Sequence, residues 1–264
     1  LGIKRDLPFD LKLAIRDTST LHMVVVSGQN LSLAVALLLG LSGFLGRRLT
    51  IILSFFIISG YVILTGGQIP VIRAALMAYF SNLAQLLGRQ QDGFWALIVI
   101  AGMMLLINPL WINDISFQLS FLATFGVVVI APILINFLKN LPTFLRNNLA
   151  LTMGAQLMVL PIISQNFHQI SLVSIPANLL TLWTIPYVLG GGLVLLSLSL
   201  VSELLAKIFA LGVGVLLTYF IYIVKFFASL PFSWEYVGEQ VWIVWVGYYL
   251  VLGGILLAIN KKLT

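Results

Sequence analysis

The chain has 264 residues, of which 61% are hydrophobic and only 8% are charged. Soluble domains carry about 25% charged residues, and a soluble protein of this length could not cover its surface with so few ionisable groups. The composition therefore excludes a soluble enzyme, a disordered chain and a coiled coil, and it predicts an integral membrane protein. At about 20 residues per crossing, the length allows roughly seven to nine membrane-spanning helices.

The first twenty residues form a charged segment that we expect to lie at the membrane surface. Charged side chains are interspersed here with Leu7, Leu11, Ala14 and Ile15, which recur at helical spacing. This pattern is typical of a short interfacial amphipathic helix. We therefore divide the chain into an interfacial segment, residues 1–20, and a transmembrane domain, residues 21–264. The chain begins with leucine rather than methionine, so we expect a fragment of a longer protein.

Long apolar runs follow, separated by short polar or glycine-rich loops. The simple runs are 21–44, 49–65, 71–87, 94–107, 115–138, 149–164, 204–230 and 241–259. The remaining run, 170–201, exceeds one simple crossing and is interrupted by Pro176, Pro186 and three consecutive glycines. Helix-breaking residues at membrane depth are tolerated only where protein or a water-filled cavity satisfies the backbone. The sequence thus predicts an all-α, polytopic helix bundle of about eight transmembrane segments with broken or re-entrant helices.

Lys and Arg residues alternate between successive loops. Basic residues follow the first, third and fifth runs, whereas the loops after the second, fourth and sixth runs contain none. Loops on the cytoplasmic side are enriched in Lys and Arg, so this alternation predicts that the N-terminal segment lies outside. If run 170–201 crosses the membrane twice instead of once, the C-terminus changes sides.

Polar side chains within the apolar runs are costly in hydrocarbon and are therefore candidates for function. The candidates are His22, Ser27, Gly28, Asn30, Arg73, Gln118, Ser120, Gln156 and Asn178. A single amide of this kind can instead bridge two helices, and a small residue can serve helix packing. Several of them on interrupted helices indicate a shared polar path through the bundle.

Arg73 is the main charge that the predicted topology does not explain. Pro70 suits the first turn of a helix, which places Arg73 near the positive end of the helix dipole and on the predicted outer side. A phosphate group or an anionic lipid would relieve both conflicts. Snorkelling of the side chain to the outer interface is the alternative. Four tryptophans are interpreted as an interfacial aromatic belt rather than as base-stacking platforms: Trp183, Trp234, Trp242 and Trp245.

These clusters resemble, in order, the motifs of the ComEC family of competence proteins. His22, Ser27 and Gly28 match the opening motif His-Leu-Leu-Ala-Val-Ser-Gly-Leu-His-Val, whereas Asn30 stands where a histidine is usual. Residues 70–77 match the Pro-x-x-Arg-Ala-x-x-Met motif, and residues 116–123 resemble Gly-Phe-Gln-Leu-Ser-Phe-x-Ala. Later similarities are Ala155-Gln156, Leu160-Pro161, Phe167 and Asn178-Leu179.

The resemblance implies a channel for single-stranded DNA in the bacterial cytoplasmic membrane during natural transformation. It implies no catalytic activity and no metal or other cofactor. It also implies single-stranded DNA, the lipid bilayer and the DNA-uptake machinery as partners, and it is compatible with a homo-oligomer. Longer members of the family carry an oligonucleotide-binding-type domain before this region and a metallo-β-lactamase-like domain after it. The His-x-His-x-Asp-His metal motif is absent from this sequence.

Two other functions remain open. Broken helices with polar centres are also typical of small-solute and lipid transporters, although no inverted repeat relates the two halves of this chain. An intramembrane serine hydrolase would use Ser27 as the nucleophile and His168 or His22 as the base. However, Val25 stands where a Gly-x-Ser-x-Gly elbow needs its first glycine.

Overall fold

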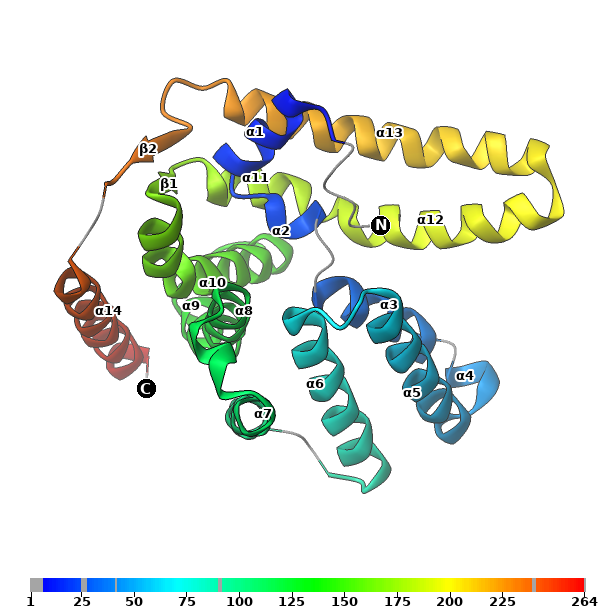
Figure 1. The fold of residues 1–264 in the computed structure, drawn as a ribbon, viewed down its shortest axis with the longest axis horizontal. Coiled ribbons are helices and arrows are strands. Elements are labelled where there is room, and N and C mark those ends of the chain that lie inside the picture. Colours follow the sequence, from blue (N-terminus) through cyan, green and yellow to red (C-terminus); the bar gives the residue numbers. More distant parts are fainter. Residues whose placement is uncertain (1–6, 25–27, 41, 90–91, 239–240, 264) are drawn as a thin grey trace. The chain divides into compact units, whose positions relative to one another are not determined.

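A computed structural model describes residues 7–24, 28–40, 42–89, 92–238 and 241–263 (Figure 1). The chain divides into two compact units, each made of two separate stretches. Unit 1 comprises Leu1–Gln90 with Pro176–Ser233, and unit 2 comprises Gln91–Ile175 with Trp234–Thr264. Helices dominate both units, which confirms the predicted all-α class.

Apart from α1, the helices of unit 1 follow the predicted apolar runs. They are α1 (Phe9–Asp17), α2 (Leu21–Val24), α3 (Gly28–Gly40), α4 (Ser42–Leu45), α5 (Arg47–Leu64), α6 (Ile69–Leu86), α12 (Thr184–Val201) and α13 (Glu203–Ala228). Helix α11 (Ser174–Thr181) crosses the boundary between the two units. The predicted interruption of run 170–201 is therefore confirmed, because a strand, a short helix and a long helix share this run.

Unit 2 contains the remaining elements. They are α7 (Gly93–Ile107), the 3-10 helix η2 (Pro109–Asn113), α8 (Ile115–Phe125), the π-helical turn η3 (Gly126–Ile130), α9 (Ala131–Phe137), α10 (Thr143–Phe167), β1 (Gln169–Ser171), β2 (Trp234–Tyr236) and α14 (Trp242–Leu263).

Five helical segments within the described residues are long and apolar enough to cross a membrane. They are Ile115–Phe137, Thr143–Phe167, Ser174–Val201, Glu203–Ala228 and Trp242–Ile259. Shorter apolar helices cover Asn30–Phe44, Arg48–Leu64 and Gly93–Ile107. The predicted number of about eight segments stays a prediction, because length and composition establish the five long ones only.

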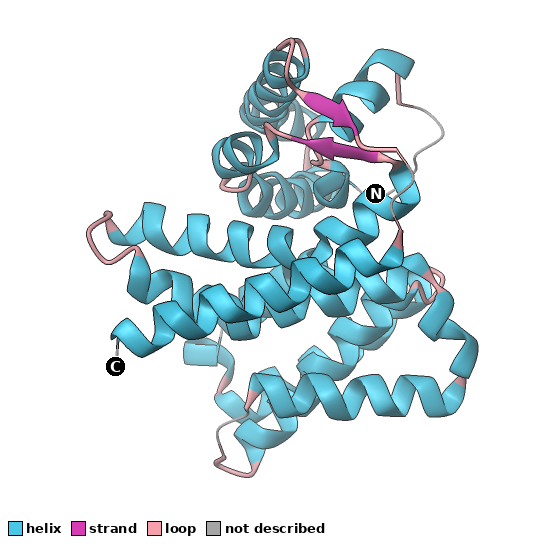
Figure 2. Cartoon of the chain, turned by 90° about the vertical axis from the view of Figure 1, so that its left-hand side faces the viewer, coloured by secondary structure: helices cyan, strands magenta, loops and turns pink. Residues whose placement is uncertain are grey.

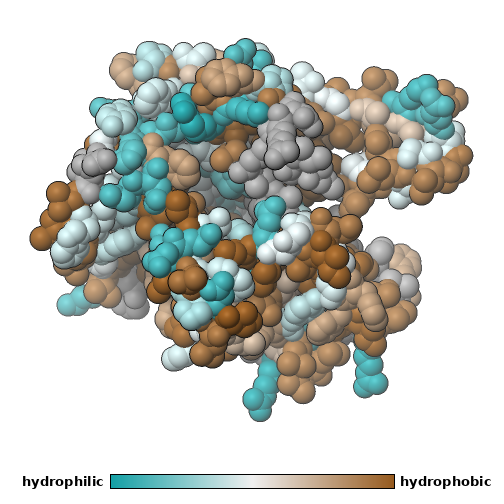
Figure 3. Space-filling view, in the orientation of Figure 1, coloured by the Kyte–Doolittle hydropathy of each residue, from teal (hydrophilic) through white to brown (hydrophobic). Residues whose placement is uncertain are grey.

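Apolar side chains are exposed along these helices, as a lipid-facing surface requires. Leu106 is 87% exposed and Leu200 is 89% exposed, so these side chains lack protein neighbours that would bury them. Figure 3 shows hydrophobic side chains over most of the α12–α13 hairpin, with hydrophilic ones at its far end. In water such a surface would be an aggregation hazard, whereas in a bilayer it is the expected lipid contact.

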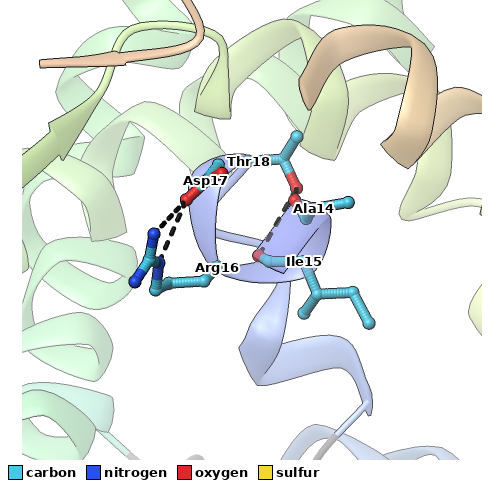
Figure 4. A network of polar contacts seen from close by, with 5 residues as sticks. All are labelled: Ala14, Ile15, Arg16, Asp17 and Thr18. Atoms are coloured by element: carbon cyan, nitrogen blue, oxygen red, sulfur yellow. Dashed lines mark hydrogen bonds and ion pairs between the residues drawn. The ribbon is translucent and has the colours of Figure 1, made fainter. Parts of the chain in front are cut away.

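Helix α1 is the amphipathic helix expected in the N-terminal segment, and its apolar face packs against protein. Leu11 and Ile15 belong to a buried cluster with Phe220 and Val224 of α13. At its C-terminus the hydroxyl of Thr18 donates to the carbonyl oxygen of Ala14 at 2.8 Å (Figure 4). Beside it, Arg16 and Asp17 form an ion pair at 3.0 Å.

The run 115–138 forms one long helix with a π-helical turn at its centre. Pro132 lies just after this turn and has no N–H to offer the carbonyl four residues before it, so a regular α-helix is disfavoured here. The turn closes with the amide of Ala131 donating to the carbonyl of Gly126. Helix α10 crosses at this point, because a Cβ on Gly154 would lie 2.7 Å from the Gly126 oxygen and 3.2 Å from the Ala131 nitrogen.

Strands β1 and β2 form an antiparallel two-stranded sheet in unit 2 (Figure 2). Gln169 pairs with Tyr236, Ile170 with Glu235, and Ser171 with Trp234. The amide of Val237 also donates to the carbonyl of His168 at 3.0 Å. The sequence analysis did not anticipate this sheet, since three-residue strands more than sixty positions apart leave no periodic pattern.

Two tyrosines of α14 form hydrogen bonds with backbone carbonyls of α10. The hydroxyl of Tyr248 donates to the carbonyl of Leu157, and that of Tyr249 to the carbonyl of Met158, both at 2.9 Å. Pro161 lies inside α10 and cannot donate to the carbonyl of Leu157 four residues earlier. Tyr248 therefore satisfies a carbonyl that the helix itself leaves unpaired, and such groups are costly where no water reaches them.

We expect Tyr248→Phe to destabilise the protein by about 1–3 kcal/mol, because it orphans the Leu157 carbonyl. Tyr249→Phe is the matched control with a smaller loss, since Met158 keeps its regular partner within the helix. Adding Pro161→Ala to Tyr248→Phe should recover part of the loss by supplying an N–H. Unfolding in mixed micelles with increasing denaturing detergent measures the three variants against the parent protein. Equal losses for the two tyrosine variants, or no recovery with alanine, would contradict this account.

Candidate functional site

The site begins with the turn that precedes α6. Gly66 and Gly67 have φ angles of +69° and +63°, a backbone region that suits glycine, and they lead the chain out of α5. Gln68 is the N-cap residue and Pro70 occupies the first turn, as predicted. Arg73 consequently lies in the second turn of α6. Its guanidinium contacts the sulfur of Met77 at 3.4 Å, and the side chain is half-buried.

Gly28, the first described residue of α3, lies directly against this turn of α6. A Cβ built on Gly28 would lie 2.8 Å from the Cβ of Ala74, 3.1 Å from Nη2 of Arg73 and 3.2 Å from the carbonyl oxygen of Pro70. Only glycine permits such a close approach of two helices. Gly28 of α3 therefore packs against the first two turns of α6, and the Arg73 guanidinium lies beside it.

The electrostatics of this end are positive. The N-terminus of α6 carries a partial positive charge from its unpaired N–H groups, and Arg73 adds a full one. No acidic side chain occurs between Asp17 and Asp92 in the sequence. An anion is the chemical partner that such an arrangement favours.

A polar contact to α5 completes this part of unit 1. The side chain of Asn30, one half-turn after Gly28, is hydrogen-bonded to the hydroxyl of Tyr61. The hydroxyl of Ser32 donates to the carbonyl of Gly28 at 3.0 Å. Below this polar end, Leu31 and Val71 are fully buried in an apolar cluster of α3, α5 and α6 (Figure 1). The structure thus brings together three of the predicted site residues, Gly28, Asn30 and Arg73.

His22 and Asn178 lie in another part of unit 1, around α2 and α11. His22 is exposed, and its Nδ1 contacts the carbonyl of Ser19 at 3.0 Å. Asn178 is only 4% exposed, and its Oδ1 has no hydrogen-bond partner among the described residues. Three residues further along α11, the hydroxyl of Thr181 reaches Met23 of α2 at 3.4 Å. Ser27 lies outside the described residues.

The other three predicted residues belong to unit 2, where two have visible structural roles. The amide of Gln118 donates to the carbonyl of Ile112 at 2.8 Å, which holds η2 against the start of α8. The carbonyl of Ser120 accepts from the hydroxyl of Thr124 at 2.9 Å. Gln156 is half-buried on α10, two residues after the glycine that contacts the π-helical turn. Their placement along a conduit stays a prediction.

Asn108 and Asp114 explain the spacing of the Asn-Pro and Ser-Phe-Gln segments, because each of the two residues caps the helix that follows it. The Asp114 carboxylate caps α8 by accepting from the amides of Ser116 at 2.7 Å and Phe117 at 3.1 Å. Asn108 caps η2 in the same way by accepting from the amide of Leu110 at 3.1 Å. The Asn-Pro and Ser-Phe-Gln segments thus build a well-capped corner between two helices.

One buried polar pair was missed in the sequence analysis. Asn82 on α6 donates to the hydroxyl oxygen of Ser54 on α5 at 2.6 Å, and the two residues are 1% and 0% exposed. The rule that polar residues inside apolar runs are informative would have found Asn82. Tyr61 left no such signal, because tyrosine is common in membrane helices. Among the described residues no three His, Cys, Asp or Glu side chains group to hold a metal ion.

The exposed apolar helices and the polar, positively charged end of α3 and α6 define an α-helical membrane protein. The family model described as Competence protein matches residues 1–262, so the chain belongs to this family. This confirms the resemblance found in the sequence.

Two relatives share 31% identity with this chain. ComE operon protein 3 of Bacillus subtilis (strain 168) aligns over 193 residues, which are 70% of this chain and 24% of that protein. The uncharacterized protein YcaI of Escherichia coli (strain K12) aligns over 220 residues, which are 77% of this chain and 29% of that protein. The chain thus spans about a quarter of the length of these relatives. No solved structure gives a significant match.

Proposed function

We propose that this chain serves DNA uptake during natural transformation, as part of a channel that passes single-stranded DNA across the bacterial cytoplasmic membrane. The observation that carries the proposal is the contact of Gly28 with Pro70, Arg73 and Ala74, which holds a guanidinium against α3 near the start of α6. Membership of the Competence family supports it. In this proposal the N-terminal segment lies outside, as the alternation of loop charges indicates.

The chemistry of the ligand fits this arrangement. A single strand carries one phosphate per nucleotide, and each phosphate can accept charge-assisted hydrogen bonds from a guanidinium. A conduit must bind its cargo favourably enough for entry and weakly enough for exit. One arginine followed by uncharged amides and hydroxyls meets both demands. Arg73 would attract phosphate groups, and Asn30, Gln118, Gln156 and Asn178 would supply weaker polar contacts further along.

We expect the chain to be a passive, non-catalytic channel without a cofactor. Other proteins therefore have to supply the direction of transport. Proteins of the uptake machinery would deliver or pull the strand, and a second copy of the chain would be a further partner. The bilayer surrounds the exposed apolar helices.

We expect Arg73→Ala in the full-length protein to lower uptake of labelled single-stranded DNA about tenfold or more, as loss of a charge-assisted hydrogen bond predicts. Arg73→Lys keeps the charge but not the planar fork, so its uptake should lie in between. Arg89→Ala is the control, because Arg89 is an exposed arginine just beyond the other end of α6. Unchanged uptake with Arg73→Ala, at normal membrane levels, would refute the proposal.

Two outcomes would favour the alternatives. Substrate-dependent uptake of a small solute or lipid by vesicles, without any effect on DNA, would indicate a transporter. Labelling by a serine-directed probe that Ser27→Ala abolishes would indicate a hydrolase.

A further inference from the structure

The two-stranded sheet of unit 2 indicates where water or lipid headgroups begin. Open sheet edges do not occur where lipid tails are the neighbours, because their backbone N–H and C=O groups would lose water without gaining partners. A sheet of two strands has such edges on both sides. Strands β1 and β2 therefore lie in contact with water or headgroups rather than with lipid tails.

One face of this sheet carries two exposed aromatic rings. Successive side chains of a strand point to opposite faces, so Trp234 and Tyr236 share a face, and Glu235 points to the other. Trp234 is 41% exposed and Tyr236 is 67% exposed. Their cross-strand partners are Ser171 and Gln169, a hydroxyl and an amide. The rings thus stand among polar neighbours in an aqueous position, which differs from the surroundings of an aromatic belt on apolar helices.

The spacing of the rings suits nucleobases. Residues two apart on a strand are separated by about 6.7 Å, close to twice the 3.4 Å rise between stacked bases. A flat base inserted between the two side chains can therefore contact both. The ring of His168 lies 6.5 Å from that of Tyr236. Aromatic side chains on an exposed sheet face are a recurrent means of holding unpaired bases.

We propose that Trp234 and Tyr236 form a stacking platform for the bases of single-stranded DNA. This inference rests on the proposed function and replaces the belt interpretation of Trp234. The platform binds bases, whereas Arg73 binds phosphate, so the two contacts address different parts of the same strand. Because every base has a stacking face, the platform binds without sequence preference. Glu235 on the opposite face repels phosphate groups and directs the backbone away from that side.

Binding of two oligonucleotides to the full-length protein in nanodiscs tests the platform. One is a twenty-nucleotide thymidine strand, and the other is a strand of equal length with the same phosphates but no bases. Trp234→Leu and Tyr236→Leu should each weaken binding of the thymidine strand about 5- to 150-fold, and leave the abasic strand unchanged. Trp234→Phe and Tyr236→Phe keep a ring and should bind nearly as the parent does, which separates stacking from folding. Trp242→Leu is the control, because Trp242 is 71% exposed at the start of α14.

Three results would overturn the platform. The leucine variants could bind both strands as the parent does, or lose both strands equally. They could also change only the partitioning of the protein into phosphatidylethanolamine–phosphatidylglycerol vesicles, which would restore the belt interpretation. If Arg73→Ala then still weakens binding of both strands, the proposed function stands without the platform. If the parent protein binds neither strand, the proposed function fails as well.

Discussion

Gly126→Ala should destabilise unit 2 by about 3 kcal/mol, one of the largest effects expected for any single methyl group in this chain. A Cβ on Gly126 would overlap the backbone carbonyl of Gly154 on α10. Backbone cannot move aside as a flexible side chain can, so the two helices would have to separate. Overpacking of this kind typically costs about 1–3 kcal/mol, and a clash with backbone lies at the upper end of that range. Unfolding in mixed micelles, together with the amount of protein in the membrane, measures the loss.

Gly102→Ala provides the control. Gly102 lies within α7, also in unit 2, and a Cβ there would meet nothing within 4 Å. Alanine favours a helix by about 1 kcal/mol over glycine, so this substitution should be neutral or stabilising. Gly154→Ala should behave like Gly126→Ala, since its Cβ would lie 2.7 Å from the Gly126 oxygen. If Gly126→Ala is as stable as Gly102→Ala, the two helices do not cross at these glycines.

The elements that could be predicted from the sequence are those defined by local pattern. Apolar runs of membrane length define the long helices, and Pro70 and Asp114 lie at helix starts for stereochemical reasons that act over a few residues. The interruption of run 170–201 follows from Pro176 and Pro186 in the same way. These features need no knowledge of the rest of the fold.

What could not be predicted depends on neighbours distant in the sequence. The Gly126–Gly154 contact joins two ordinary small residues, and only the packing of α10 on the π-helical turn makes them critical. Likewise, nothing in the sequence pairs Tyr248 with the carbonyl that Pro161 leaves free. The strands β1 and β2 are too short for any periodic signal, so the shared face of Trp234 and Tyr236 appears only once their register is known.

In the candidate site, too, local pattern identifies single residues, whereas contacts between distant residues could not be predicted. The polar residues Asn30 and Arg73 could be singled out because each interrupts an apolar run. Their assembly could not, since residues 28 and 73 belong to different helices and their spacing in sequence implies no contact. The structure explains why the Ser-Gly and Pro-x-x-Arg-Ala motifs occur together in one chain. Gly28 of the first motif packs against Arg73 and Ala74 of the second.

Gly28→Ala should reduce uptake of single-stranded DNA about tenfold or more in the full-length protein, although no charge is altered. The added methyl group would lie 2.8 Å from the Cβ of Ala74, which has no freedom to rotate away, and 3.1 Å from Nη2 of Arg73. Helices α3 and α6 must then move apart, and the guanidinium loses its place against α3 near the start of α6. A displacement of about 1 Å suffices to impair a site built on such positioning. Uptake of labelled DNA at matched protein levels is the measurement.

A compensating substitution separates this positioning effect from simple damage to the fold. Ala74→Gly removes the nearest obstacle, so Gly28→Ala combined with Ala74→Gly should regain much of the uptake, at a cost of about 1 kcal/mol in helix propensity. Gly40→Ala at the far end of α3 meets nothing within 4 Å and should leave uptake unchanged. If the double variant is no better than Gly28→Ala although both are inserted normally, the contact between the two motifs does not position Arg73. Full recovery of uptake would instead indicate that the Ser-Gly and Pro-x-x-Arg-Ala motifs form one site, because residues that act independently give additive losses.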